Sequence, residues 1–115
     1  MREHLAHFNI AGFTYYDGVL VFNELKIGTE LHLVPEATNQ YDPRAIAVYY
    51  NDYKLGFIPK SDNRIFYKLM KVGFEQFEVR VQRLAPDENP EQQISVIVHL
   101  ICEVNTNKDI QNEAR

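Results

Sequence analysis

The sequence predicts a mostly β fold with one main α-helix, arranged as a small antiparallel β-barrel of the OB or SH3-like type. Five or six short runs alternate between apolar and polar residues, as half-buried strands do. Only one segment has a convincing amphipathic helical pattern, and the strands do not alternate with helices as in βαβ units. The chain has 115 residues, of which 45% are hydrophobic, enough for one domain to fold alone.

The first third of the chain contains two expected strands around an irregular segment. Alternation predicts a strand over residues 5–14, in which Gly12 indicates a bulge or a close backbone approach. Residues 19–27 combine helical spacing with β-branched side chains, so we expect an irregular or helical segment. Residues 30–36 alternate cleanly until Pro35, which limits further pairing.

The remaining strands are expected in the second part of the chain. Residues 45–50 and 54–58 are separated by Asn51-Asp52, a compact hairpin signal. Residues 75–84 alternate, and residues 94–103 form a long last strand after a loop rich in Pro and Glu.

One amphipathic helix is expected after Pro59. Ser61 can cap its start, Asp62 lies in its first turn, and Gly73 can end it. The apolar face recurs at three- and four-residue spacing and comprises Ile65, Phe66, Leu69 and Met70. The polar side presents three cations, namely Arg64, Lys68 and Lys71.

We expect a folded domain over residues 1–104 and a flexible polar tail over residues 105–115. The single cysteine, Cys102, lies in an apolar run and is expected to be a buried core thiol. No apolar run approaches the roughly 18 residues of a membrane-spanning helix, and the N-terminus lacks a signal-peptide pattern. A cytoplasmic location without a membrane partner is the resulting expectation.

Charge is segregated along the sequence. The formal net charge of −4 disfavours nucleic acid as a partner. Residues 44–71, however, contain six basic and two acidic side chains. The local field decides whether a phosphate is attracted, because screening limits exposed charges to roughly 8 Å at physiological salt. The alternative interpretation is a solvated helix face with scattered strand lysines.

A shaped turn precedes the expected strand at residue 45. Asn39 and Asp42 are turn formers that bond nearby backbone, and Pro43 disfavours helix before it. The turn therefore displays Tyr41 and Asp42 on the edge of a strand, a usual place for binding residues. Alternatively, it is a plain Asx-turn in which Asp42 satisfies backbone donors or pairs with Arg44.

Four blocks in order carry a resemblance to a known family: GFTYYDG at residues 12–18, residues 28–33, NQYDPRAIAV at residues 39–48, and LGFIPK at residues 55–60. They resemble the HIRAN domain, which occurs at the N-terminus of some SWI/SNF-type DNA translocases and as small standalone bacterial proteins. The resemblance covers about residues 8–81 and implies a modified OB-like β-barrel.

The resemblance implies binding of single-stranded DNA with recognition of a free 3′-hydroxyl end. Tyr15 and Tyr41 match the stacking tyrosines, and Asp42 matches the acid that receives the hydroxyl. Lys60 matches a basic position suited to the phosphate backbone, and Asn39 matches a polar residue that shapes the loop. A role in DNA repair or replication-fork processing, with a helicase or nuclease in trans, is the corresponding expectation.

Several of these assignments have alternatives. Tyr16, rather than Tyr15, could be the exposed ring of the pair, and Lys60 could be a solvated residue before the helix. The chain also departs from the family pattern. Thr14 stands where DNA-binding relatives often carry a basic residue, and Phe57 stands where some carry a polar or basic one. Both departures reduce the expected contacts with the DNA backbone.

Catalysis, metal binding and a cofactor are not expected. The histidines His4, His7, His32 and His99 are too scattered to show a metal spacing, and no phosphate-cradling glycine loop is present. Cys102 has no evident histidine partner. The rival function is a protein-interaction module that kept the barrel, lost the DNA site and binds peptides by strand addition.

Overall fold

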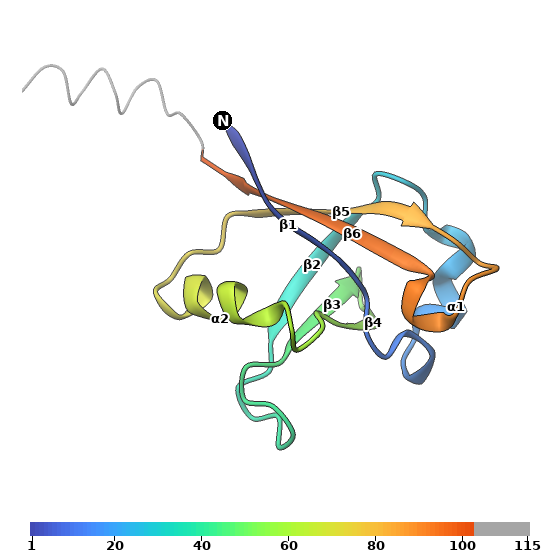
Figure 1. Ribbon diagram of the computed structural model, residues 1–115, viewed down its shortest axis with the longest axis horizontal. Helices are drawn as coiled ribbons and strands as arrows, with labels where there is room; N and C mark the ends of the chain where they lie inside the picture. Colours follow the sequence, from blue (N-terminus) through green and yellow to red (C-terminus); the bar gives the residue numbers. More distant parts are fainter. Residues whose placement is uncertain (103–115) are drawn as a thin grey trace, which may run out of the picture.

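Residues 1–102, which the computed structural model describes, form one antiparallel sheet of six strands in the order β1-β6-β5-β2-β3-β4 (Figure 1). The strands are β1 (Arg2–Asn9), β2 (Glu30–Pro35), β3 (Ile46–Tyr50), β4 (Tyr53–Phe57), β5 (Phe77–Leu84) and β6 (Ile94–Ile101). The helical elements are η1 (Phe13–Tyr15), α1 (Gly18–Val21), η2 (Phe22–Glu24), α2 (Asn63–Lys71) and η3 (Pro90–Gln92). The expected tail over residues 105–115 lies outside the described residues.

The sheet does not close into the expected barrel, although the mostly β composition and antiparallel pairing are confirmed. Within the described residues, the two outer strands β1 and β4 are linked through one isolated bridge. Ala11 and Phe57 exchange two backbone hydrogen bonds there, with N···O distances of 2.8 and 2.9 Å. The ladder stops because Gly12 adopts a left-handed φ of 72° and turns the chain into η1. The first strand therefore ends at Asn9 rather than at residue 14.

The close backbone approach predicted at Gly12 occurs instead at Gly56 of β4. A Cβ atom at Gly56 would lie 2.3 Å from the carbonyl oxygen of Ala11, and its φ is 149°. Only glycine permits this contact without displacement of the backbone. The contact holds the segment before η1 directly against β4.

The core lies between the two halves of the bent sheet, while α2 and α1 lie at opposite ends of the molecule (Figure 1). Phe66 of α2 is fully buried and packs edge-on against Phe8 of β1, with ring centroids 6.0 Å apart. It also lies 5.7 Å from the ring of Phe77 on β5. The helix is thereby anchored against β1 and β5, which fixes where its first residues lie.

The expected amphipathic helix is confirmed as α2, but its start and its apolar face differ from the prediction. Ser61 does not cap it: Asp62 holds the N-cap position without a side-chain capping bond, and the Ser61 hydroxyl donates to the Asp62 carboxylate at 3.2 Å. Gly73, with φ of 92°, follows the C-cap as predicted. Ile65 is 45% exposed because it faces outward beside β1 rather than into the core.

Two further predictions have opposite outcomes. The hairpin at Asn51-Asp52 is confirmed, and Asn51 adopts the positive φ of 52° that such a turn requires. Cys102, expected in the core, is exposed. It follows the last residue of β6 at the end of the sheet, where its N–H donates to the carbonyl of Met1 at 3.0 Å.

None of the helices in residues 1–102 is long and apolar enough to cross a bilayer.

Candidate functional site

The five residues selected from the sequence line one groove with a volume of about 280 Å³. Asn39, Tyr41 and Asp42 come from the loop between β2 and β3, Lys60 follows β4, and Tyr15 ends η1. The groove is completed by Ala11, Gly12, Tyr16, Ala45, Phe57 and Ile58. The fold thus brings together three segments that are far apart in sequence, and the binding roles of these side chains remain predictions.

Two tyrosine rings stand free beside the groove. The side chains of Tyr15 and Tyr41 are 84% and 88% exposed. Tyr16 is 39% exposed, and its ring packs edge-on against Phe57 with centroids 5.4 Å apart. Tyr15 is therefore the open ring of the pair. Tyrosine combines an apolar ring with a polar hydroxyl and is enriched at binding interfaces.

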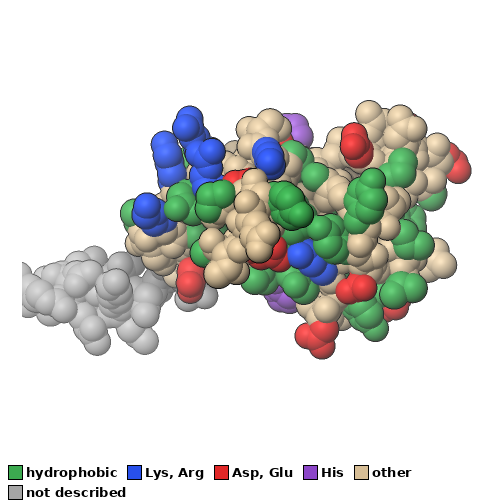
Figure 2. Space-filling view, turned by 90° about the horizontal axis from the view of Figure 1, so that it is seen from below, with side chains coloured by type: hydrophobic (Ala, Val, Ile, Leu, Met, Phe, Trp, Pro, Cys, Tyr) green, Lys and Arg blue, Asp and Glu red, His purple; other side chains and the backbone are tan. Residues whose placement is uncertain are grey.

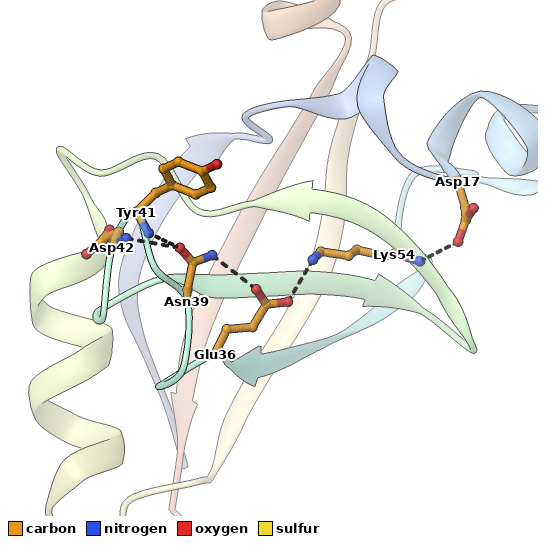
Figure 3. Close-up of polar contacts among 6 residues, drawn as sticks. All are labelled: Asp17, Glu36, Asn39, Tyr41, Asp42 and Lys54. Carbon is orange, nitrogen blue, oxygen red and sulfur yellow. Dashed lines mark hydrogen bonds and ion pairs between the residues drawn. The ribbon is translucent and has the colours of Figure 1, made fainter.

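The loop that carries Tyr41 is held by Asn39 (Figure 3). The Asn39 side-chain oxygen accepts hydrogen bonds from the backbone N–H of Tyr41 at 2.8 Å and of Asp42 at 3.0 Å. This is the local turn chemistry that the sequence predicted for Asn39. The backbone is consequently fixed while the Tyr41 ring stays free to contact a ligand.

Asp42 is held by two intramolecular hydrogen bonds. Its Oδ1 accepts the backbone N–H of Arg44 at 2.9 Å, and its Oδ2 accepts the Asn63 amide at 2.9 Å. The Arg44 N–H, above all, lowers the pKa of the Asp42 carboxyl; the Asn63 amide and the charges of Lys60 and Arg44 lower it further, while partial burial opposes them. Asp42 is therefore ionised at neutral pH. Each carboxylate oxygen keeps a second lone pair, so the Asx-turn leaves acceptor capacity for a ligand.

Asn63 is a site residue that sequence reasoning missed. It is 3% exposed and is the buried polar side chain of the described residues. Its amide donates to the Asp42 carboxylate and also to the carbonyl of Arg44 at 3.1 Å, so α2 is hydrogen-bonded to the turn and stabilises it. A signal was available, because Asn63 shares the i, i+3, i+7 face of the helix with Phe66 and Met70. A polar residue on an apolar stripe needs buried partners.

Lys54 was counted in the sequence only as part of the basic segment, yet it connects the walls of the groove. Its Nζ donates to Glu36 Oε2 at 2.7 Å, while Glu36 Oε1 accepts the amide of Asn39 at 3.3 Å (Figure 3). The same ammonium lies 4.6 Å from the ring centroid of Tyr16 and 4.3 Å from that of Phe57. Phe57, a departure from the family pattern, thus contributes to the support of the groove.

The histidines are less scattered than the sequence indicated. The His4 ring centroid lies 5.7 Å from that of His99 and 5.9 Å from that of His7, across β1 and β6. Within residues 1–102, however, no group of three or more His, Cys, Asp or Glu side chains could hold a metal ion.

The open, OB-like sheet and its aromatic groove define a class of small β domain with an exposed ligand-sized site. The sequence profile of the HIRAN domain matches residues 5–101, and the chain therefore belongs to the HIRAN domain family, whose members are DNA-binding modules.

Two solved structures share this fold. A protein from Lactobacillus plantarum superimposes with a TM-score of 0.75 at 26% sequence identity, covering 87% of this chain and 95% of its own. The HIRAN domain of human HLTF gives a TM-score of 0.71 at 20% identity, covering 96% of this chain and 84% of its own. No curated protein shows significant similarity in sequence.

Proposed function

We propose that this chain is a single-stranded DNA binding module that captures a free 3′-hydroxyl end in the groove. The observation that carries the proposal is the combination of two highly exposed tyrosine rings with an ionised carboxylate, all lining one groove. Family membership supports the same class of ligand.

The two rings supply stacking surfaces for unpaired bases. A base stacked on an aromatic side chain contributes about 1–3 kcal/mol, and the interaction tolerates any sequence. In a duplex both faces of each base are already covered by neighbouring base pairs. Stacking on Tyr15 and Tyr41 therefore selects single strands and frayed ends.

Asp42 supplies the recognition of the terminus. A carboxylate accepts a hydrogen bond from a terminal sugar hydroxyl and repels a terminal phosphate. Lys60 lines the same groove, and its ammonium is suited to a backbone phosphate near that end. Together the two charges would orient the strand with its hydroxyl end inward.

The proposed cellular role is the holding of DNA ends during repair or replication-fork processing, with the chemistry performed by a helicase or nuclease in trans. HIRAN domains are not catalytic by themselves, so the chemistry is assigned to a separate enzyme. The HIRAN module would contribute the selection of the DNA 3′ end.

Fluorescence anisotropy with labelled oligonucleotides tests the proposal. A single strand with a 3′-hydroxyl should bind more tightly than a blunt duplex of the same length. Tyr41→Ala should weaken the single-strand complex by about 1–3 kcal/mol, or roughly five- to 150-fold. Tyr53→Ala is the matched control, because Tyr53 is also exposed but does not line the groove. Equal affinity for both nucleic acids would remove the stacking argument.

A protein-interaction module is the second candidate, favoured by the open outer edge of β1. Among the described residues this edge pairs with no strand over Arg2–Asn9, so a peptide could add there. Strand addition rests on backbone hydrogen bonds and changes little with salt, whereas phosphate contacts weaken steeply as salt rises. A salt titration of any complex formed therefore separates the two functions.

A further inference from the structure

The exposed side of α2 carries a stripe that the groove does not use. Arg64, Lys68 and Lys71 are exposed and recur at i, i+4 and i+7, so they share one side of the helix, whereas Tyr67 is half-buried and packs against the core. Lys71 Nζ lies 5.7 Å from the ring centroid of Tyr67. Figure 2 shows Lys and Arg side chains gathered at the end of the molecule where α2 lies in Figure 1. A row of exposed cations attracts the phosphates of a nucleic acid.

The protein itself does not neutralise these cations. No carboxylate of residues 1–102 lies within 4.0 Å of the charged groups of Arg64, Lys68 or Lys71. In contrast, most other described cations form ion pairs with glutamates, namely Arg2, Lys54, Arg80 and Arg83. A chain with a net charge of −4 thus leaves one basic face open. Its field is available to an external anion.

The basic face adjoins the groove. A shallow hollow of about 320 Å³ between β1 and α2 is lined by Ala6, Arg64, Ile65 and Lys68, together with Ser61 and Asp62. Lys60 lines the groove and Ser61 lines this hollow. Consecutive Cα atoms are about 3.8 Å apart, so the two depressions are lined by directly neighbouring residues.

We propose that the basic face of α2 is a second DNA subsite, which binds internal phosphates of the strand whose 3′ end lies in the groove. The inference rests on the proposed function and extends it from the end of the strand to its body. The cations are spaced along a helix of nine residues, about 13 Å long. Such a row matches a polyanion better than a single anionic group, and the neighbouring positions of Lys60 and Ser61 place it within reach of a strand that leaves the groove.

The length of the oligonucleotide tests this subsite. Labelled oligothymidines of four and twelve nucleotides, both with 3′-hydroxyl ends, are titrated between low and moderate salt against the full chain. The triple variant Arg64→Gln, Lys68→Gln and Lys71→Gln should bind the 12-mer at least about tenfold more weakly at low salt, with a salt slope about two units smaller. Its affinity for the 4-mer should change by less than about twofold, because a short strand fills only the groove.

A matched control removes the same charge elsewhere. Arg2→Gln, Lys26→Gln and Arg83→Gln together change the net charge equally but lie outside α2 and the groove. This control should retain most of the 12-mer affinity. Gln resembles Lys and Arg in helix propensity, so thermal unfolding should show that the α2 variant stays folded.

The outcomes separate this inference from the proposed function. Equal losses of the 4-mer and the 12-mer, or equal losses in the two triple variants, would overturn the α2 subsite alone. Binding of the 12-mer that depends on α2 but not on Tyr41 or Asp42 would overturn capture of the end in the groove, while it would support the contact of α2 with phosphates. A wild-type chain that binds neither oligonucleotide would contradict both.

Discussion

Asp42→Ala is the most informative single substitution, because Asp42 has both a structural and a proposed binding role. Its two carboxylate oxygens accept one intramolecular hydrogen bond each, from the Arg44 backbone and from the Asn63 amide. The remaining lone pairs are those proposed to accept the terminal hydroxyl of DNA. Removal of the side chain therefore affects the stability of the fold and the affinity for DNA ends separately.

The stability loss follows from the burial of Asn63. Without the carboxylate, one N–H of an amide that is 3% exposed has no partner. An unsatisfied buried donor costs about 1–3 kcal/mol of unfolding free energy. In a domain of this size, each kcal/mol lowers Tm by about 4–8 °C. The variant should still be folded at room temperature, where binding is measured.

The binding loss follows from the charge of the acceptor. A hydrogen bond to an ionised group contributes about 1.5–3 kcal/mol, so Asp42→Ala should weaken binding of 3′-hydroxyl ends about ten- to a hundred-fold. A 3′-phosphate should impose a comparable penalty on the wild type, but only a small further penalty on the variant. The two changes remove the same interaction and are therefore non-additive.

The assay is a four-way anisotropy cycle, with wild type and Asp42→Ala against 3′-hydroxyl and 3′-phosphate oligonucleotides. Asn63→Ala is the matched control, since it breaks the same buried hydrogen bond and keeps the carboxylate. It should lose similar stability yet retain the preference for 3′-hydroxyl. Additive penalties in the cycle would refute recognition of the 3′-hydroxyl by Asp42. Loss of the preference for 3′-hydroxyl ends in Asn63→Ala, measured where this variant is fully folded, would refute it as well.

The pH dependence of stability provides an independent check on Asp42. Its pKa is lowered from the ordinary value of 3.8 in the folded protein, so the ionised form favours folding. The contribution of this group is fully present above the unfolded pKa and disappears as the pH falls through the folded pKa. The stability difference between wild type and Asp42→Ala should consequently shrink below about pH 4, as measured by urea unfolding.

Two further substitutions test other parts of the argument. Lys60→Ala should weaken binding equally for all sequences and flatten the salt slope by about 0.7, as expected for one lost phosphate contact with a single strand; an unchanged slope would assign Lys60 to the solvated interpretation. Gly56→Ala should lower the free energy of unfolding by more than the about 1–3 kcal/mol of backbone strain, because its Cβ would also clash with the carbonyl of Ala11. Gly28→Ala is the control for strain alone, since Gly28 has φ of 93° and no atom within 4 Å of the added Cβ; equal losses in urea unfolding would show that the close contact is unimportant.

Local chemistry explains what could be predicted. The hairpin at Asn51-Asp52, the end of α2 at Gly73 and the turn held by Asn39 each depend on residues within a few positions. The alternation of β2, β5 and β6 likewise reports a burial that every second residue shares, whereas β3 begins with three consecutive buried residues. The boundaries of the other strands were predicted to within two residues, whereas the first strand, predicted over residues 5–14, runs from Arg2 to Asn9 because it starts earlier and the chain turns at Gly12.

Contacts between distant segments could not be predicted, because no local pattern encodes them. The bridge between Ala11 and Phe57 joins the segment after β1 to β4, and Tyr15 and Tyr41 then line the same groove. The support of Asp42 by Asn63 crosses 21 positions of sequence. The solvent exposure of a side chain also depends on contacts between distant segments and therefore could not be predicted from the local pattern.

By itself the sequence determined the mostly β, antiparallel character of the fold with one main helix, the local turn at Asn39 and, through resemblance, the family and the five candidate residues; it did not determine that the sheet stays open. Only the tertiary structure decided that these five side chains line one groove, that Tyr15 rather than Tyr16 is open, and that Cys102 is exposed. The physical reason is the range of the interactions. Turns and alternation arise from neighbours along the chain, whereas a groove arises from surfaces that meet only after the core has packed.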